Sequence, residues 1–381
     1  MSVVQPTDIG IIGCGVISDA YLKGAANARH IRVKSVADLR PEVARAKAAE
    51  FGVQAATPDS LLADPDIAVV VNLTVPLAHA QVKADIISAG KHAYSEKPLT
   101  ATFAEAQAVL RLAKAAGLRV GGAPDTFLGG GHQACRYAID AGRIGRPLAG
   151  AATVLSHGME HWHPNPNFFF QRGGGPLLDL GPYYVTALVN MLGPVASVAA
   201  RVEIGNATRT ITSEPLAGQN ITVNVPTTAT ALLRFRDGAT ITLAASWDVW
   251  KHRRLPFELY GVDGSLLVPD PNWFGGEPML SDKGAEWEAL DITAHPFGAN
   301  NRTTRAGLEV ADYRIIGLLD MVAAIRNNRP HRASGELCAH VLEVLEAVAV
   351  ASDEARWVDL TTSCERPAPV PLGAGEEVFE R

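Results

Sequence analysis

The chain has 381 residues with a net charge of −6, and its 47% hydrophobic and 19% charged residues suit a folded globular protein. An acidic balance without a long Lys/Arg run argues against a nucleic-acid or anionic-membrane surface. Polar residues such as Asn72 and Thr74 interrupt the apolar stretches before the ~18 residues of a membrane span. Four scattered cysteines form no zinc spacing or disulfide framework, and Met1 to Asp8 lacks a signal-peptide core, so we expect a cytoplasmic protein.

The first third of the chain alternates short apolar strands with helical segments. This alternation is typical of βαβ crossovers and predicts an α/β class with a doubly wound parallel sheet. We expect this domain to span residues 1–124. The expected strands are 8–13, 31–37, 67–73, 91–95 and 118–122, and the expected helices are 16–28, 41–51, 76–90 and 103–116.

After about Pro124 the pattern changes, and residues 125–381 are expected to form a second domain. Strands dominate it, and Asp237-Gly238 and Asp263-Gly264 are typical hairpin turns, which favours an antiparallel sheet. The expected helices are 127–141 and 336–355, and the expected strand-like runs are 148–156, 197–204, 227–235, 239–247 and 255–269.

A glycine-rich turn, Gly13 to Ser18, follows the first strand and opens the first helix. Gly13 permits the tight turn, and Gly15 lets the backbone approach a pyrophosphate at the helix N-terminus. The third position of this signature is normally Gly or Ala, and Ser18 is slightly larger. The strand before and the helix after it still favour a dinucleotide site over a plain glycine turn.

Asp38 ends the second strand, where a carboxylate accepts hydrogen bonds from ribose hydroxyls. It repels a 2′-phosphate, whereas Arg40 could pair with one, so we expect NAD with NADP as an alternative. Loops after later strands project to the same edge of the sheet. His79 there suits packing or capping better than catalysis. The expected cofactor-binding residues are Gly13, Gly15, Val16, Ile17, Asp38, Arg40, Thr74, Pro76, His79, Glu96 and Lys97.

Lys97, Asp179 and Tyr183 are the expected catalytic residues. Hydride transfer from a hydroxyl needs a group that takes the proton and another that stabilises negative charge on oxygen. Lys97 supplies positive charge, Tyr183 can carry the proton, and Asp179 can orient the hydroxyl or the lysine. In one continuous helix Asp179 and Tyr183 would share a face, but Pro182 also fits a helix that begins near Gly181.

Together these motifs resemble the glucose–fructose oxidoreductase / inositol dehydrogenase / MocA (Gfo/Idh/MocA) family over nearly the whole chain. The resemblance implies an N-terminal Rossmann domain and a C-terminal α/β domain with a large, mostly antiparallel sheet. It also implies NAD(P)-dependent redox chemistry on a sugar, polyol or sugar derivative, in a homodimer or homotetramer. By this resemblance Lys97 is the catalytic lysine and Asp179 the acid of the second motif.

Many members of that family carry histidine four residues after the aspartate, where this chain has Tyr183. Tyrosine there is similar to the glucose–fructose oxidoreductase, dihydrodiol and xylose dehydrogenase branch, in which it serves as the acid/base. Tyr184 has the wrong spacing for this role. The resemblance to inositol dehydrogenase is correspondingly weaker.

Residues 157–168 are dense in histidine, asparagine and aromatic side chains, which hydrogen-bond to hydroxyls and stack on sugar rings. The expected substrate-binding residues are Lys97, His157, His161, Trp162, His163, Asp179 and Tyr183. A surface loop, or zinc on the three histidines, is an alternative, but hydride chemistry with Lys97 needs no metal. Trp247 and Trp250 suit the same cleft or plain packing, and Arg302 and Arg305 suit a solvated surface.

The sequence therefore predicts an NAD(P)-dependent sugar or polyol dehydrogenase acting on CH–OH groups. One alternative is an enzyme with an internal redox cycle, such as an NAD-retaining glycosidase or lyase or a sugar–sugar oxidoreductase. A non-catalytic NAD-binding sensor is disfavoured because Lys97, Asp179 and Tyr183 are all present.

Overall fold

The computed structural model describes residues 5–304 and 307–380; Arg305 lies outside them. The chain divides into two compact units. The first consists of Met1–Gly130, Thr293–Ala339 and Pro367–Arg381, and the second of Gly131–Ile292 and His340–Arg366. The chain thus returns to the first unit twice. The division at residue 124 stays a prediction.

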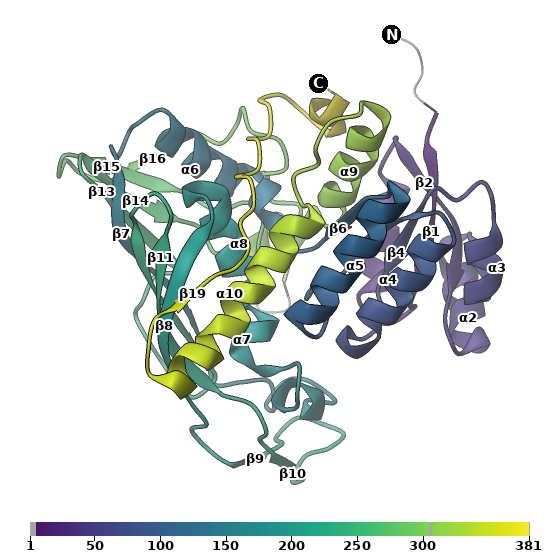
Figure 1. The fold of residues 1–381 in the computed structure, drawn as a ribbon, viewed down its shortest axis with the longest axis horizontal. Helices are drawn as coiled ribbons and strands as arrows, with labels where there is room; N and C mark the ends of the chain where they lie inside the picture. The colour runs from purple at the N-terminus through teal and green to yellow at the C-terminus, as the bar shows by residue number, and fades with distance from the viewer. Residues whose placement is uncertain (1–4, 305–306, 381) are drawn as a thin grey trace. The chain divides into compact units, whose positions relative to one another are not determined.

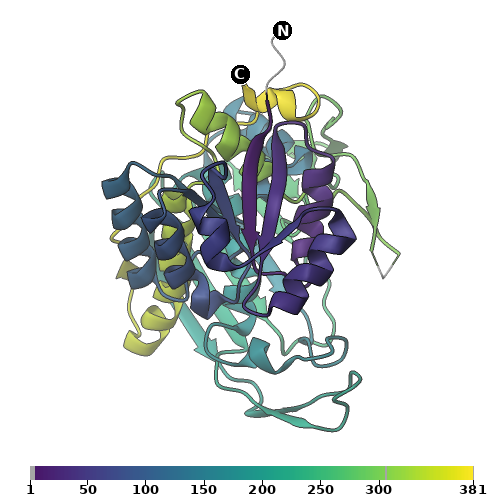
Figure 2. The ribbon, with the colours of Figure 1, turned by 90° about the vertical axis from the view of Figure 1, so that its right-hand side faces the viewer.

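The first unit contains a parallel sheet of six strands among the described residues, in the order β3-β2-β1-β4-β5-β6. This order confirms the doubly wound sheet. Helices lie on both of its sides, and α4 and α5 pack beside each other on one of them (Figures 1 and 2). The strands are β1 (Thr7–Ile12), β2 (Ile31–Ala37), β3 (Gln54–Ala56), β4 (Val69–Asn72), β5 (His92–Ser95) and β6 (Val120–Gly122). The helices between them are α1 (Ser18–Ala26), α2 (Pro41–Phe51), α3 (Pro58–Ala63), α4 (His79–Ser88) and α5 (Phe103–Ala116), with short 3-10 turns at Pro76–Ala78 and Thr126–Leu128.

Local chemistry explains where these helices begin and end. At the start of α5, the Thr102 hydroxyl accepts from the Glu105 N–H at 3.3 Å and the Glu105 carboxylate accepts from the Thr102 N–H at 3.0 Å. Gly117 ends α5 in the left-handed conformation. The core behind them is aliphatic, and each fully buried Val or Ile contributes roughly 1.5–3 kcal/mol. One cluster consists of Ile12, Ala37, Leu61, Ile67, Val70, Ile86 and Ala93.

Later segments complete the first unit, and only part of them was expected. They are β17 (Arg302–Thr303), β18 (Glu309–Val310), α9 (Ile316–Arg326), the start of α10 (Gly335–Glu354) and a 3-10 turn at Glu376–Glu380. Arg302 pairs with Asp312 at the surface.

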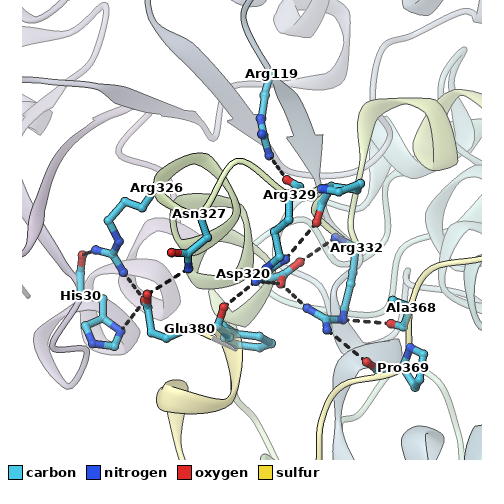
Figure 3. A network of polar contacts seen from close by, with 12 residues as sticks. His30, Arg119, Asp320, Arg326, Asn327, Arg329, Arg332, Ala368, Pro369 and Glu380 are labelled. Carbon is cyan, nitrogen blue, oxygen red and sulfur yellow. Dashed lines mark hydrogen bonds and ion pairs between the residues drawn. The ribbon is translucent and has the colours of Figure 1, made fainter. Parts of the chain in front are cut away.

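Buried Asp320 of α9 anchors the C-terminal tail (Figure 3). Its carboxylate accepts from Arg329 at 2.9 Å and from the Arg332 backbone N–H at 2.6 Å. The Arg332 guanidinium in turn donates to the carbonyls of Ala368 at 2.9 Å and Pro369 at 3.0 Å. The tail is therefore part of this unit rather than a loose end.

The second unit contains a mixed sheet of nine strands within the described residues, in the order β16-β15-β14-β13-β7-β12-β11-β8-β19. Of the neighbours described, β7 and β12 run parallel and the other pairs antiparallel, which confirms a large, mostly antiparallel sheet. Its strands are β7 (Pro147–Leu155), β8 (Val195–Glu203), β11 (Thr228–Phe235), β12 (Thr240–Ser246), β13 (Phe257–Gly261), β14 (Gly264–Val268), β15 (Met279–Asp282), β16 (Glu288–Ala289) and β19 (Val358–Asp359). A small ribbon of β9 (Thr208–Thr210) and β10 (Asn220–Thr222) stands apart, and the remaining elements are α6 (Gly130–Asp140), the 3-10 turn Asn167–Phe170, α7 (Gly175–Asp179) and α8 (Gly181–Leu192).

Both predicted hairpins are present, because Asp237-Gly238 joins β11 to β12 and Asp263-Gly264 joins β13 to β14. Burial alternates along β11, so one face of the sheet is covered and the other is exposed. Helix α8 packs against β7 on the covered face. Among the described residues, no helix is long and apolar enough to cross a membrane.

Candidate active site

The glycine turn after β1 has the shape that a pyrophosphate site requires. Gly13 has φ +103°, and a Cβ there would lie 2.6 Å from the Leu73 carbonyl carbon, so only glycine fits. A Cβ at Gly15 would meet nothing within 4 Å, which leaves open space beside the backbone. Ser18 fits as the third residue because its buried hydroxyl donates to the Gly15 carbonyl at 2.6 Å.

Asp38 lies beside this turn, at the end of β2. One carboxylate oxygen accepts the Cys14 N–H at 3.0 Å and the other the Arg40 N–H at 3.0 Å. The Arg40 side chain is 3.7 Å from the same carboxylate. These bonds hold Asp38 in place and leave acceptor capacity for ribose hydroxyls.

Large apolar side chains are exposed just beyond the strand ends. Val16 is 95% and Leu39 92% exposed, an arrangement that suits contact with a flat aromatic base. Val75 and Leu77 are also exposed in the loop after β4. Near the glycine turn, the apolar cofactor contacts expected from the sequence are Val16 and Ile17, and Leu39 was missed. The signal that could have found Leu39 is its position directly after Asp38, the acid that ends the second strand.

Asn72 shapes the loop that contains Thr74 and Pro76. Its side-chain oxygen accepts from the Thr74 N–H at 3.1 Å and the Thr74 hydroxyl at 2.6 Å, and its amide donates to the His79 carbonyl at 3.3 Å. The fully buried His79 ring faces the carbonyls of Pro98 at 2.7 Å and Thr74 at 3.0 Å. Burial and the nearby Lys83 lower the pKa of His79 to about 4. The ring joins two loops, and its cofactor contact stays a prediction.

Glu96 holds the backbone of Lys97 at the carboxyl end of β5. One oxygen of the buried Glu96 carboxylate accepts the Lys97 N–H at 3.0 Å. The other accepts the Tyr21 hydroxyl at 2.9 Å and lies 3.3 Å from the Arg314 guanidinium. Glu96 is therefore a support for Lys97. Tyr21 and Arg314 were missed because no local pattern links them to it.

Asp125 is a second buried acid in this unit. One of its oxygens accepts the backbone N–H groups of Ile315 at 3.2 Å and Gly317 at 2.9 Å, at the start of α9. Burial raises the pKa of Asp125 to about 6, against the lowering effect of Arg314. Asp125 thus fixes the segment that carries Arg314.

In the second unit, a glycine run precedes Asp179 and Tyr183. Gly175 has φ +86°, and a Cβ at Gly174 would lie 2.2 Å from the Phe169 carbonyl oxygen, so the run packs tightly and then opens α7. Asp179 is half-buried at the end of α7, whereas Tyr183 is buried in the first turn of α8. One continuous helix over both residues is wrong; the start at Gly181 is confirmed.

Tyr184, the neighbour of Tyr183 in the sequence, has its own side-chain partner. Its hydroxyl donates to Asp270 at 3.2 Å, and its ring stacks on Phe257. Burial, with Asp270 beside it, raises the pKa of Tyr184 far above the ordinary value for a phenol. Tyr184 is therefore a packing residue and a natural control for Tyr183.

Two histidines of the histidine-rich loop in the second unit pack against aromatic rings. The His157 ring stacks on Trp250 with centroids 3.3 Å apart, and burial lowers the pKa of His157. His163 meets Trp162 and Phe168 edge to face. Trp162 is 53% exposed and His161 is also exposed, so both can reach a ligand. Trp247, by contrast, is a core residue.

Buried Arg209 holds this loop in shape. It pairs with Glu160, donates to the His157 carbonyl at 2.9 Å and pairs with Asp248 at 2.7 Å. Burial raises the pKa of Asp248, but hydrogen bonds from Thr228, Thr227 and Arg209 lower it below its ordinary value. In the described parts of the chain, no three His, Cys, Asp or Glu side chains are grouped to hold a metal ion.

Comparisons with known proteins identify the family of both parts of the chain. Residues 7–122 match the family model of an oxidoreductase family with an NAD-binding Rossmann fold, and residues 132–267 match the GFO/IDH/MocA C-terminal domain. The chain belongs to the Gfo/Idh/MocA family.

Two curated Gfo/Idh/MocA relatives act on sugars by name. Levoglucosan dehydrogenase of Pseudarthrobacter phenanthrenivorans is 25% identical over 94% of this chain and 99% of its own length. A dTDP-3,4-didehydro-2,6-dideoxy-alpha-D-glucose 3-reductase of Streptomyces violaceoruber is 31% identical over 70% of this chain and 73% of its own. The chain is thus an NAD-binding oxidoreductase whose relatives include sugar dehydrogenases and reductases.

Solved structures show the same fold. An NAD-binding oxidoreductase from Klebsiella pneumoniae superimposes with a TM-score of 0.80 at 22% identity, covering 94% of this chain and 100% of that one. Levoglucosan dehydrogenase in complex with NADH and L-sorbose gives 0.78 at 24% identity, over 93% and 99%.

Gly15→Ala is expected to weaken NADH binding at least 10-fold while leaving the cofactor-free melting temperature unchanged. The new methyl group meets no protein atom within 4 Å, but it enters the space beside the backbone that a pyrophosphate needs. Gly13→Ala is the matched contrast, because its Cβ clashes with Leu73 and should lower that temperature by several degrees. NADH fluorescence titration and thermal melting measure both. Wild-type NADH affinity in Gly15→Ala would place the pyrophosphate elsewhere.

Asp38→Asn is expected to shift the preference for NADH over NADPH by about 10- to 100-fold towards NADPH. The amide keeps an oxygen for the Cys14 or Arg40 N–H but loses the charge that repels a 2′-phosphate. Dissociation constants for both dinucleotides, measured by fluorescence, give the ratio. An unchanged ratio with intact binding would remove Asp38 from the ribose.

Proposed function

We propose that this protein is a dehydrogenase that oxidises a CH–OH group of a sugar, polyol or sugar derivative with NAD, NADP being the alternative cofactor. The observation that carries the proposal is Lys97 on a braced loop at the carboxyl end of β5, in an NAD-binding unit. The open backbone at Gly15 and the fixed carboxylate of Asp38 fit a dinucleotide.

The proposed mechanism gives Lys97, Asp179 and Tyr183 separate roles at one substrate hydroxyl. When bound, NAD accepts the hydride from the carbon. The Lys97 ammonium binds the hydroxyl oxygen and stabilises its negative charge, and Tyr183 takes the proton. Asp179 orients the hydroxyl or the lysine. In the reverse direction Tyr183 returns the proton to the carbonyl oxygen.

Relatives suggest which compounds to try first. By name they act on levoglucosan, 1,5-anhydro-D-fructose, D-xylose and inositol, and we infer a pyranose-like or cyclic polyol substrate. Exposed Trp162 and the neighbouring His161 and His163 are the proposed ring contacts.

The test follows nicotinamide absorbance with NAD and NADP against levoglucosan, D-xylose, myo-inositol, D-glucose and D-gluconate, and with NADH against 1,5-anhydro-D-fructose. Turnover with one of them supports the proposal and identifies the substrate group. If protein that binds NADH turns over none of them, a dehydrogenase of these sugars that releases its cofactor is excluded, and an internal redox cycle or an NAD-binding sensor takes its place.

The homodimer or homotetramer and the cytoplasmic location expected from the sequence belong to the same proposal. The four cysteines are scattered along the chain without the spacing of a disulfide framework, which favours a reducing compartment. Light scattering in solution tests the oligomer.

A further inference from the structure

The buried face of α4 carries two ionisable side chains that the proposed mechanism does not use. His79 and Lys83 are four residues apart, so they project from the same face of the helix. Both are fully buried. Fully buried lysines are rare in proteins unless they are paired, so Lys83 calls for an explanation.

Both side chains meet the backbone directly after Lys97. His79 contacts the Pro98 carbonyl at 2.7 Å, and the Lys83 ammonium donates to the carbonyl of Leu99. On the other side, the Glu96 N–H donates to the Asn72 carbonyl at 3.1 Å. Every residue from Glu96 to Leu99 is therefore held by a hydrogen bond to a neighbouring group.

The buried ammonium of Lys83 destabilises the folded state, although it donates to only one carbonyl. Burial lowers the pKa of Lys83 to about 7, whereas the unfolded chain keeps the ordinary value near 10.5. The unfolded state then binds more protons between these values, so Lys83 destabilises the fold at neutral pH and below. Cys338 raises the pKa of Lys83, but the effect of burial outweighs it. An apolar side chain would fill the same space without this penalty, but it would leave the Leu99 carbonyl without its donor, so the contact to that carbonyl is what the ammonium provides.

We propose that Lys83 is a positioning residue for Lys97, which it serves by fixing the Leu99 carbonyl and with it the backbone that presents the catalytic ammonium. This inference rests on the proposed function, in which Lys97 acts on the substrate hydroxyl. A displacement of about 1 Å at a reacting group can lower turnover roughly 100-fold.

Lys91 is a matched control in the same unit. It is also buried, and its ammonium donates to the carbonyls of Asp64 at 2.6 Å and Ile67 at 2.8 Å. These carbonyls precede β4, at the edge of the sheet opposite the strand ends that carry Asn72 and Ser95. Lys91 thus braces the fold in the same chemical way without touching the loop of Lys97.

The experiment compares Lys83→Met, Lys91→Met and Lys97→Met in the full chain, with NAD and the fastest sugar of the panel above. For Lys83→Met we expect kcat to fall about 10- to 100-fold, with NADH affinity and KM within about twofold. We expect a melting temperature close to wild type, because removing a buried ammonium offsets the loss of the single contact to the Leu99 carbonyl. For Lys91→Met, which takes the donor from two carbonyls, we expect wild-type kcat and a melting temperature lower by roughly 3–8 °C.

The outcomes separate this inference from the proposed function. Wild-type kcat in Lys83→Met, or a joint loss of NADH affinity and melting temperature, would overturn the positioning role. If Lys97→Met retains turnover, the proposed mechanism itself fails, whatever Lys83→Met does. A loss of turnover in both, with the melting temperature of Lys83→Met preserved, supports both.

Discussion

Turnover is expected to fall about 10³-fold when Lys97 is replaced by methionine, while NADH binding stays within about threefold. Methionine keeps the apolar stem of the side chain and removes the ammonium that would stabilise charge on the substrate oxygen. The backbone contact to Glu96 uses the Lys97 N–H and is untouched by the substitution. Steady-state kinetics and NADH fluorescence measure the two effects separately.

The control for this prediction is a substitution at Arg314, which contacts Glu96 and not the proposed substrate. Arg314→Met removes one cation from Glu96 but leaves the bond from Tyr21, so it should reduce turnover less than Lys97→Met does. Equal turnover in Lys97→Met and wild type would exclude Lys97 from the chemistry. A collapse of NADH binding in Lys97→Met would instead show that it serves the cofactor.

Tyr183→Phe is expected to lower turnover about 100-fold or more, with KM for the sugar changed far less, because the phenol is the proposed carrier of the proton. The neighbouring variant Tyr184→Phe removes a hydroxyl of similar burial that donates to Asp270. It should cost roughly 1–3 kcal/mol of stability by leaving Asp270 without that donor, yet keep kcat.

Kinetics and thermal melting of the two tyrosine variants therefore show opposite patterns. If Tyr184→Phe loses turnover and Tyr183→Phe does not, then Tyr184 is the acid/base, and the assignment of Tyr183 from its spacing to Asp179 is wrong. If neither variant changes kcat, the proton leaves by another group, and Asp179→Asn becomes the next substitution to test.

Much of the fold could be predicted because its signals are local. Continuous β-branched runs such as the three valines of β4 predict buried parallel strands, and Asp-Gly pairs predict the hairpins of the second sheet. The short β3 and α3 were missed, since three exposed or half-buried residues and a six-residue helix carry little periodicity. The return of α9 and the tail to the first unit was also missed, because tertiary contacts alone decide it.

The candidate site divides in the same way. Gly13, Asp38 and Lys97 belong to short motifs, and the residues next to them in the sequence indicate their chemistry. Their roles stay predictions. Arg314 supports Glu96 from 218 positions away, and nothing in its own segment indicates this. Lys83 reads as a surface residue of an amphipathic helix, and only the packing of α4 shows it to be buried.

The hydrogen bonds that join the C-terminal tail to Arg332, and through it to Asp320, affect when the first unit can be completed during synthesis. Domains usually fold as they emerge, N-terminal first, at about 5–20 residues per second. Here Pro367–Arg381 is made roughly 10–50 s after Gly130, so the nucleotide-binding unit receives its last segment only after the whole second unit has been synthesised. A chain that stops before Ala368 would carry both motifs but would lack the two carbonyls to which the buried Arg332 guanidinium donates.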